Sequence, residues 1–215
     1  DRLEQYFNRE ISAGSTGKTI LKLTALLHDV AKPQTKFIQD GHARFFGHQE
    51  QGAAIAGAIL ERLRFSRKEI NLAELLIKYH LRPTQMSNEG LPTDRAIYRF
   101  FRDIGEAGTD VLFLSLADHL AARGGELDKE EYRSHAEMTA YVLKKHFEET
   151  AVTAPPKIIS GRDIMESLEL PAGPAVGEML ETLKEAQAAG EIKDKTQALE
   201  YLKKLYNEKY KNIPN

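Results

Sequence analysis

Apolar residues recur at helical spacing through most of the chain. The first such stripe covers residues 20–27 and ends before Pro33, because the residue that precedes a proline disfavours the helical region. The same spacing returns in five later segments, at residues 49–63, 67–81, 93–103, 109–122 and 129–149. This pattern predicts an all-α domain that extends over residues 1–150.

One segment, at about residues 35–46, departs from helical spacing. Phe37 and Ile38 precede the dipeptide Asp40-Gly41, and two further phenylalanines follow it. An Asp-Gly pair between apolar residues favours a two-residue type I′ turn. The sequence therefore predicts a short β-hairpin inserted between two helices.

The composition changes after residue 150. The stretch TAVTAPPK at residues 150–157 contains two adjacent prolines and no charge before its lysine, which is typical of a linker, here placed at 151–159. Ser160 and Asp163 then have the spacing of a helix N-terminal capping box. We expect a small helical appendage over residues 160–215.

Composition and charge exclude several classes of protein. The chain has 215 residues and a formal net charge of −2, which argues against a protein that binds polyanions over its whole surface. It has no cysteine, so disulfides, thiolate zinc sites and a cysteine nucleophile are excluded. Its longest apolar runs are far shorter than the ~18 residues of a membrane span, and no signal-peptide core is evident, so we expect a cytoplasmic protein.

Four residues stand at chemically notable positions. His28 ends the first apolar helix, His48 follows the hairpin, His80 ends another helix, and Asp118 interrupts a nearly continuous apolar helix. Because burial of an unpaired carboxylate is costly, Asp118 is either exposed on a narrow face, paired with a cation or bound to a metal. Imidazoles and carboxylates from several helices can hold a divalent ion. Alternatively, His48 and His80 only form hydrogen bonds to helix ends.

Four segments around these residues resemble the HD superfamily of metal-dependent phosphohydrolases. They are LLHDVAKP at 26–33, FGHQE at 46–50, YHLRP at 79–83 and SLAD at 115–118. The chain is more closely similar to the HD region of bacterial tRNA nucleotidyltransferase/poly(A) polymerase (CCA-adding) proteins, and residues 93–108 and 160–192 are similar to the segments that follow there. The resemblance implies an HD-type helical bundle, with tRNA or other RNA and nucleotide phosphate esters as partners.

The resemblance also implies a metal site. His28, Asp29 and Asp118 match three residues that bind a divalent metal in the family, such as Mg, Mn or Ni, and His48 and His80 are candidates for a second metal or a phosphate. The family pattern has one more histidine on an earlier helix. No histidine precedes His28 in this sequence, so we expect a site that is short of one ligand.

Two functions follow from the resemblance. One is a phosphohydrolase acting on nucleotide or RNA-terminal phosphates, in which Lys32 and Arg82 are the catalytic candidates that offset developing charge. Lys32 could equally be a cation that stabilises a helix C-terminus. The other is a non-catalytic RNA-binding body and tail. The nucleotide-transfer head of the family has no counterpart before residue 28, so we expect the chain alone to transfer no nucleotide.

The most basic region of the chain extends from residue 62 to residue 102. It has nine Lys and Arg against four acids. Within it, Arg95, Arg99 and Arg102 are spaced i, i+4 and i+7, which places them on one helical face. A solvated helix face explains such spacing, and contact with RNA phosphates is the competing interpretation, because guanidiniums pair bidentately with phosphate oxygens.

Overall fold

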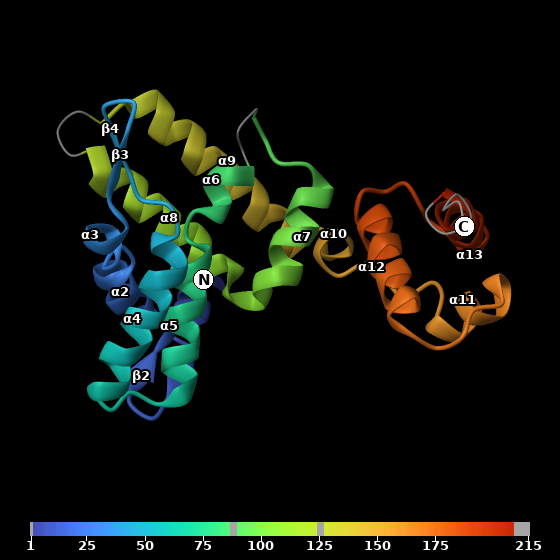
Figure 1. The fold of residues 1–215 in the computed structure, drawn as a ribbon, viewed down its shortest axis with the longest axis horizontal. Helices are drawn as coiled ribbons and strands as arrows, with labels where there is room; N and C mark the ends of the chain where they lie inside the picture. The colour runs from blue at the N-terminus through green and yellow to red at the C-terminus, as the bar shows by residue number, and fades with distance from the viewer. Residues whose placement is uncertain (1, 87–89, 124–126, 209–215) are drawn as a thin grey trace. The chain divides into compact units, whose positions relative to one another are not determined.

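The computed structural model describes residues 2–86, 90–123 and 127–208, and within these ranges the chain is helical apart from two short hairpins (Figure 1). This confirms the predicted all-α class. The chain divides into two compact units, one formed by residues 1–91 and 104–141 and the other by residues 92–103 and 142–215. The helix at residues 94–104 thus belongs mainly to the second unit, whereas the sequence pattern placed it inside a domain spanning 1–150.

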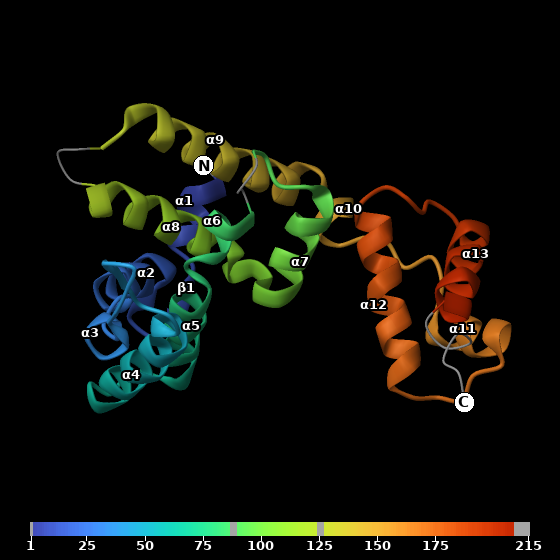
Figure 2. The ribbon, with the colours of Figure 1, turned by 45° about the horizontal axis from the view of Figure 1, so that its top comes forward.

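The first unit is a helical bundle that carries both hairpins. Its elements are α1 (Arg2–Phe7), β1 (Glu10–Ser12), β2 (Ser15–Thr16), α2 (Gly17–Leu27), α3 (Lys32–Thr35), β3 (Phe37–Gln39), β4 (His42–Arg44), α4 (His48–Arg62), α5 (Arg67–Tyr79), α6 (Arg82–Met86), the 3-10 helix η1 (Gly105–Ala107), α8 (Gly108–Arg123) and α9 (Lys129–Glu148) up to Tyr141. Figure 2 shows α8 and α9 side by side, and the rings of His119 and His135 stack with centroids 5.1 Å apart.

Helix termini in this unit follow local sequence signals. The Thr16 side chain accepts a hydrogen bond from the Thr19 N–H and so caps α2, and Ser66 with Glu69 forms a complete capping box at α5. Helix α4 approaches its neighbours closely through small residues. A Cβ on Gly52 would lie 3.3 Å from the His28 carbonyl oxygen, so the absence of a side chain there lets α4 pack directly against the end of α2.

The hairpin at residues 35–46 is confirmed. Strands β3 and β4 are antiparallel, with Phe37 opposite Arg44, Ile38 opposite Ala43 and Gln39 opposite His42. The turn residues Asp40 and Gly41 have φ values of 52° and 75°, as a type I′ turn requires. A second hairpin, β1–β2, was not predicted, because its strands have three and two residues and its register is irregular.

The second unit contains the elements α7 (Asp94–Ile104), the end of α9 from Val142, α10 (Thr150–Thr153), α11 (Gly161–Leu168), α12 (Pro174–Ala188) and α13 (Lys195–Tyr206). Its core includes Ile164, Leu183 and Leu202, and the predicted capping box of Ser160 and Asp163 starts α11. The segment predicted as a linker begins with α10 and buries Val152 and Ile159, so part of it packs as folded structure. No helix of the described ranges has the length and apolarity to cross a membrane.

Candidate metal centre

Five of the predicted site residues converge in the first unit. His28 follows the last residue of α2, Asp29 is next, His48 begins α4, His80 follows α5, and Asp118 lies on α8. The His28 Nε2 atom lies 3.3 Å from a carboxylate oxygen of Asp118 and 3.3 Å from one of Asp29. We call these five residues the His/Asp cluster.

The cluster contains two overlapping groups that could hold a metal ion. His28, His80 and Asp118 form one group, and Asp29, His48 and His80 form the other. In each group one ligand atom per residue lies within 4.8 Å of the others. His80 is shared, and it supplies the first group with a third donor. We expected a site that lacks one ligand because no histidine precedes His28. That expectation did not count His80 as a member of this group.

Hydrogen bonds orient the three imidazoles in the same way. The Nδ1 atoms of His28, His48 and His80 lie 2.9, 2.7 and 2.6 Å from the carbonyl oxygens of Ala25, Phe45 and Ile77. A carbonyl oxygen only accepts, so each Nδ1 carries a proton and donates it. In the neutral imidazole, Nε2 then has a lone pair. Histidines that bind metals are commonly held in this manner by a backbone carbonyl.

Two features of the cluster would be relieved by an additional cation. The Nε2 atoms of His48 and His80 lie 3.3 Å apart, although each would present a lone pair to the other. The Oδ1 atom of Asp29 is buried, forms no hydrogen bond with the described residues and lies 3.5 Å from His48 Nε2. A proton or a metal ion between these donors removes both problems. Imidazole nitrogens combined with carboxylate oxygens are a set that suits divalent transition metals, so the residues present fit such an ion.

The electrostatics of the cluster couple its members. Burial lowers the pKa of His28, but hydrogen bonds to Asp118 and Asp29 outweigh burial and raise this pKa to about 10. Burial raises the pKa of Asp29, whereas His28 and Lys32 hold it below the usual range. The hydrogen bond from His28 lowers the pKa of Asp118. Burial lowers the pKa of His80, which favours the neutral ring that a metal requires.

The two catalytic candidates lie at the edge of the cluster or close to it in sequence. Lys32 Nζ donates a hydrogen bond of 2.5 Å to Asp29 and lies 5.6 Å from the centre of the Phe45 ring. Its ammonium group therefore stands beside a candidate metal ligand. Arg82 is half-buried and begins α6 two residues after His80.

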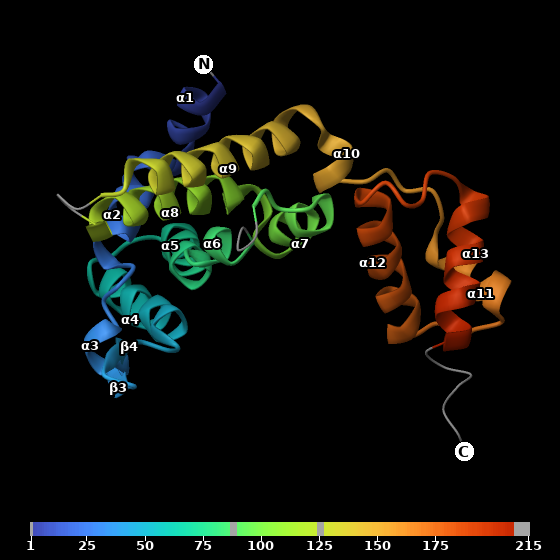
Figure 3. The ribbon, with the colours of Figure 1, turned by 90° about the horizontal axis from the view of Figure 1, so that it is seen from above.

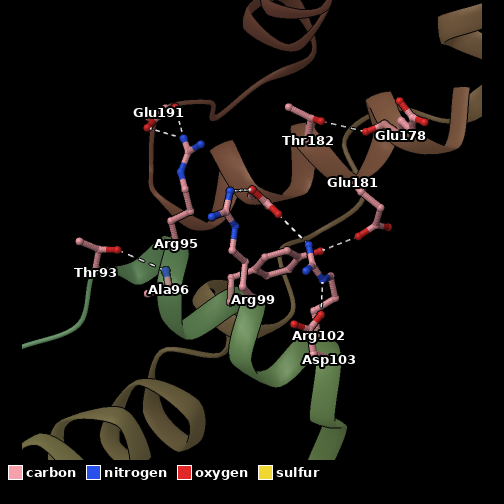
Figure 4. A network of polar contacts seen from close by, with 12 residues as sticks. Thr93, Arg95, Ala96, Arg99, Arg102, Asp103, Glu178, Glu181, Thr182 and Glu191 are labelled. Atoms are coloured by element: carbon pink, nitrogen blue, oxygen red, sulfur yellow. Dashed lines mark hydrogen bonds and ion pairs between the residues drawn. The ribbon is translucent and has the colours of Figure 1, made fainter. Parts of the chain in front are cut away.

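The three arginines predicted to contact RNA lie in the second unit, on one side of α7 (Figure 4). We call Arg95, Arg99 and Arg102 the arginine row. Arg95 Nη2 lies 2.8 and 2.9 Å from the two carboxylate oxygens of Glu191, and Arg99 and Arg102 lie 2.6 and 2.7 Å from separate oxygens of Glu185. Each guanidinium therefore contacts a carboxylate from α12 or the segment after it.

One feature was missed by the sequence analysis. A cavity of about 590 Å³ in the first unit has His119 and His135 among its lining residues. The Ser115 hydroxyl lies 3.1 Å from His135 Nε2, and the buried His119 Nε2 has no hydrogen-bond partner among the described residues. Only the presence of histidine on two adjacent helices could have indicated this cavity, since its walls come from segments distant in sequence.

Comparisons with known proteins show which family the chain is similar to. Residues 6–123 match the family described as HD domain. An A-adding tRNA nucleotidyltransferase from Deinococcus radiodurans is 37% identical over 180 residues, which cover 80% of this chain and 38% of that protein. A CC-adding tRNA nucleotidyltransferase from Thermus thermophilus is 35% identical over 186 residues, covering 84% and 39%. The chain thus spans less than two fifths of the length of these relatives.

Proposed function

Since this chain belongs to the HD-domain family, we propose that its His/Asp cluster binds a divalent metal ion and hydrolyses phosphate esters of nucleotides or of RNA ends. The main support is the contact of 3.3 Å between the Nε2 atoms of His48 and His80, beside a buried Asp29 oxygen without a partner. Such a group of donors is unfavourable without a cation. It is therefore better explained by a ligand than by packing alone.

The residues of the cluster have separate roles in this proposal. His28, Asp29 and Asp118 hold the metal, and His48 and His80 hold a second metal or orient the phosphate. A bound divalent ion supplies Lewis acidity toward the phosphate and toward a water molecule. Lys32, now paired with Asp29, donates to a phosphate oxygen and offsets its charge, and Arg82 is the second candidate for this task.

Metal titration and hydrolysis together test the proposal. We would titrate Mn²⁺ and Ni²⁺ into the wild type, His28→Ala, Asp118→Asn and, as a matched control, His42→Ala, whose histidine is exposed on β4. We expect at least about a tenfold to hundredfold loss of affinity in the first two variants and none in the control. Hydrolysis of a nitrophenyl phosphodiester should follow the same order and stop with a chelator. Equal metal affinity in all four proteins would contradict the proposal.

A second proposed function is the RNA-binding body and tail of a tRNA nucleotidyltransferase. It is supported by the similarity to A-adding and CC-adding enzymes over more than three quarters of the chain. The arginine row is the proposed phosphate contact. Its ion pairs with Glu185 and Glu191 compete with phosphate for the same guanidiniums, so RNA would have to replace these carboxylates.

A further inference from the structure

The hairpin β3–β4 exposes apolar side chains that the core does not use. Phe46 is 71% exposed, Ile38 64% and Phe37 40%. The rings of Phe37 and Phe46 lie against each other, with centroids 5.5 Å apart. Among the described strands, β3 and β4 pair only with each other, and Figure 3 shows where this hairpin lies. Large apolar side chains gathered in this way are typical of an interaction surface.

Positive charge accompanies the aromatic rings on one side of the hairpin. Phe37 and Arg44 are directly opposite in the register, so their side chains share one face, whereas Ile38 and Ala43 share the other. The ring contact places Phe46 on the side of Phe37. We call Phe37, Arg44 and Phe46 the aromatic face of the hairpin.

The cations of the hairpin are free to bind a partner. Arg44 and Lys36 form no ion pair with the described part of the chain, and both are exposed. Asp40, in the turn, is the only acid between residues 36 and 46. The surface therefore combines aromatic rings with uncompensated positive charge. A partner that offers flat rings and negative charge is complementary to it.

The two ends of the hairpin join the His/Asp cluster. Before it, α3 begins with Lys32, which contacts Asp29. After it, the carbonyl of Phe45 accepts a hydrogen bond from the Nδ1 of His48. The hairpin is therefore separated by only a few residues of the chain from the candidate metal centre.

We propose that the aromatic face binds single-stranded nucleic acid by stacking unpaired bases on Phe37 and Phe46 while Arg44 and Lys36 contact the phosphates. Base stacking on aromatic side chains tolerates any sequence, and basic residues beside the rings follow the backbone. Strands of three residues are roughly 10 Å long, enough for about three stacked bases. Duplexes are poor ligands because their base faces are already covered. The stacking does not depend on the proposed function. Delivery of the strand's terminal phosphate to the His/Asp cluster does depend on it.

The test is a binding titration with the metal removed. Fluorescence anisotropy would follow a labelled eight-nucleotide single-stranded RNA of mixed sequence, and the same strand annealed to its complement, in the presence of EDTA. We expect Phe37→Ala and Phe46→Ala each to bind the single strand about tenfold more weakly, and the wild type to bind the duplex more weakly than the single strand. Arg44→Ala should lower the slope of log affinity against log salt by about one.

Two matched variants control for general loss of apolar surface. Ile38→Ala alters the opposite side of the same hairpin, and Leu63→Ala removes an exposed side chain after α4. Both should retain affinity within about twofold, with unchanged circular dichroism. The proposal is overturned if the Phe37→Ala/Phe46→Ala double variant binds like the wild type, or if Ile38→Ala is equally impaired. It is also overturned if the double variant alters self-association or binding to anionic vesicles while RNA affinity stays constant.

Metal binding by His28→Ala is measured separately, so the two proposals can fail independently. A protein that stacks RNA but binds no metal refutes only the proposed hydrolysis. A protein that binds metal but shows no effect of the phenylalanine variants refutes only the inference drawn from the hairpin.

Discussion

The His/Asp cluster of the first unit and the arginine row of the second unit are both groups of charged residues that the sequence singles out, yet their contacts differ in kind. Every guanidinium of the row contacts a carboxylate, from Glu185, Glu191 or Asp103. In the cluster, one buried oxygen of Asp29 has no hydrogen-bond partner among the described residues, and two Nε2 atoms face each other.

This difference distinguishes polar groups that are satisfied within the fold from polar groups that a bound cation could satisfy. A carboxylate that accepts from two guanidiniums, as Glu185 does, is satisfied within the unit and fixes α12 on α7. A cluster that leaves polar atoms unsatisfied is stable only because the surrounding helices hold it in place, and a cation would lower its free energy. Clustering of charge in the sequence therefore does not by itself indicate a ligand site, and polar atoms that the structure leaves unsatisfied are the better indication.

The largest expected effect concerns stabilisation by metal. Because a ligand that binds only the folded state stabilises it by mass action, Mn²⁺ or Ni²⁺ at a hundredfold excess over Kd should add about 2.7 kcal/mol to the free energy of unfolding of the wild type. His28→Ala should lose about half of this gain or more, and His42→Ala should keep it. Urea unfolding with and without metal measures both. A gain that survives in His28→Ala would show that the ion binds elsewhere.

The second effect concerns the arginine row. Glu185→Gln keeps the shape of the side chain but removes the charge that two guanidiniums share, and we expect a loss of about 2 kcal/mol in the free energy of unfolding. Metal affinity should not change, because Glu185 lies in the other unit. Urea unfolding and a metal titration of the same preparation provide the measurement. Unchanged stability would mean that these ion pairs contribute nothing, as for many exposed pairs.

A third experiment tests RNA contact by the arginine row. If these guanidiniums exchange carboxylates for phosphates, the Arg95→Ala/Arg99→Ala/Arg102→Ala variant should bind tRNA roughly tenfold more weakly, with a smaller dependence on salt. Glu185→Gln should bind tRNA more tightly, because it releases two guanidiniums. Affinity against salt for the three proteins decides the question. If neither variant differs from the wild type, the row serves packing alone.

The smallest effect is a dependence on pH. The hydrogen bond from Arg99 lowers the pKa of Glu185 below its ordinary value of 4.5. The folded state thus favours the ionised form, so this stabilisation is complete above about pH 4.5 and is lost as the pH falls through the lowered pKa. The stability difference between wild type and Glu185→Gln should therefore shrink between pH 5 and pH 3. A difference that stays constant over this range would assign it to another cause.

Much of the local structure could be predicted from the sequence, because it depends on neighbouring residues. Helical spacing located most of the helices, Asp40-Gly41 specified the type I′ turn, and Ser160 with Asp163 specified the start of α11. Four matched segments, around His28-Asp29, His48, His80 and Asp118, together indicated the family that the comparison confirms. Whether these residues bind a metal is still a prediction.

Contacts between distant segments could not be predicted in the same way. Arg99 and Glu185 are 86 residues apart, and His48 and His80 are 32 apart, so nothing in the local pattern shows that they meet. Spacing places three arginines on one face of a helix, but it does not state what covers that face. Local propensity and turn chemistry act within a few residues, whereas the pairing of charges, the unsatisfied Asp29 oxygen and the exposure of Phe46 arise from the packing of whole helices.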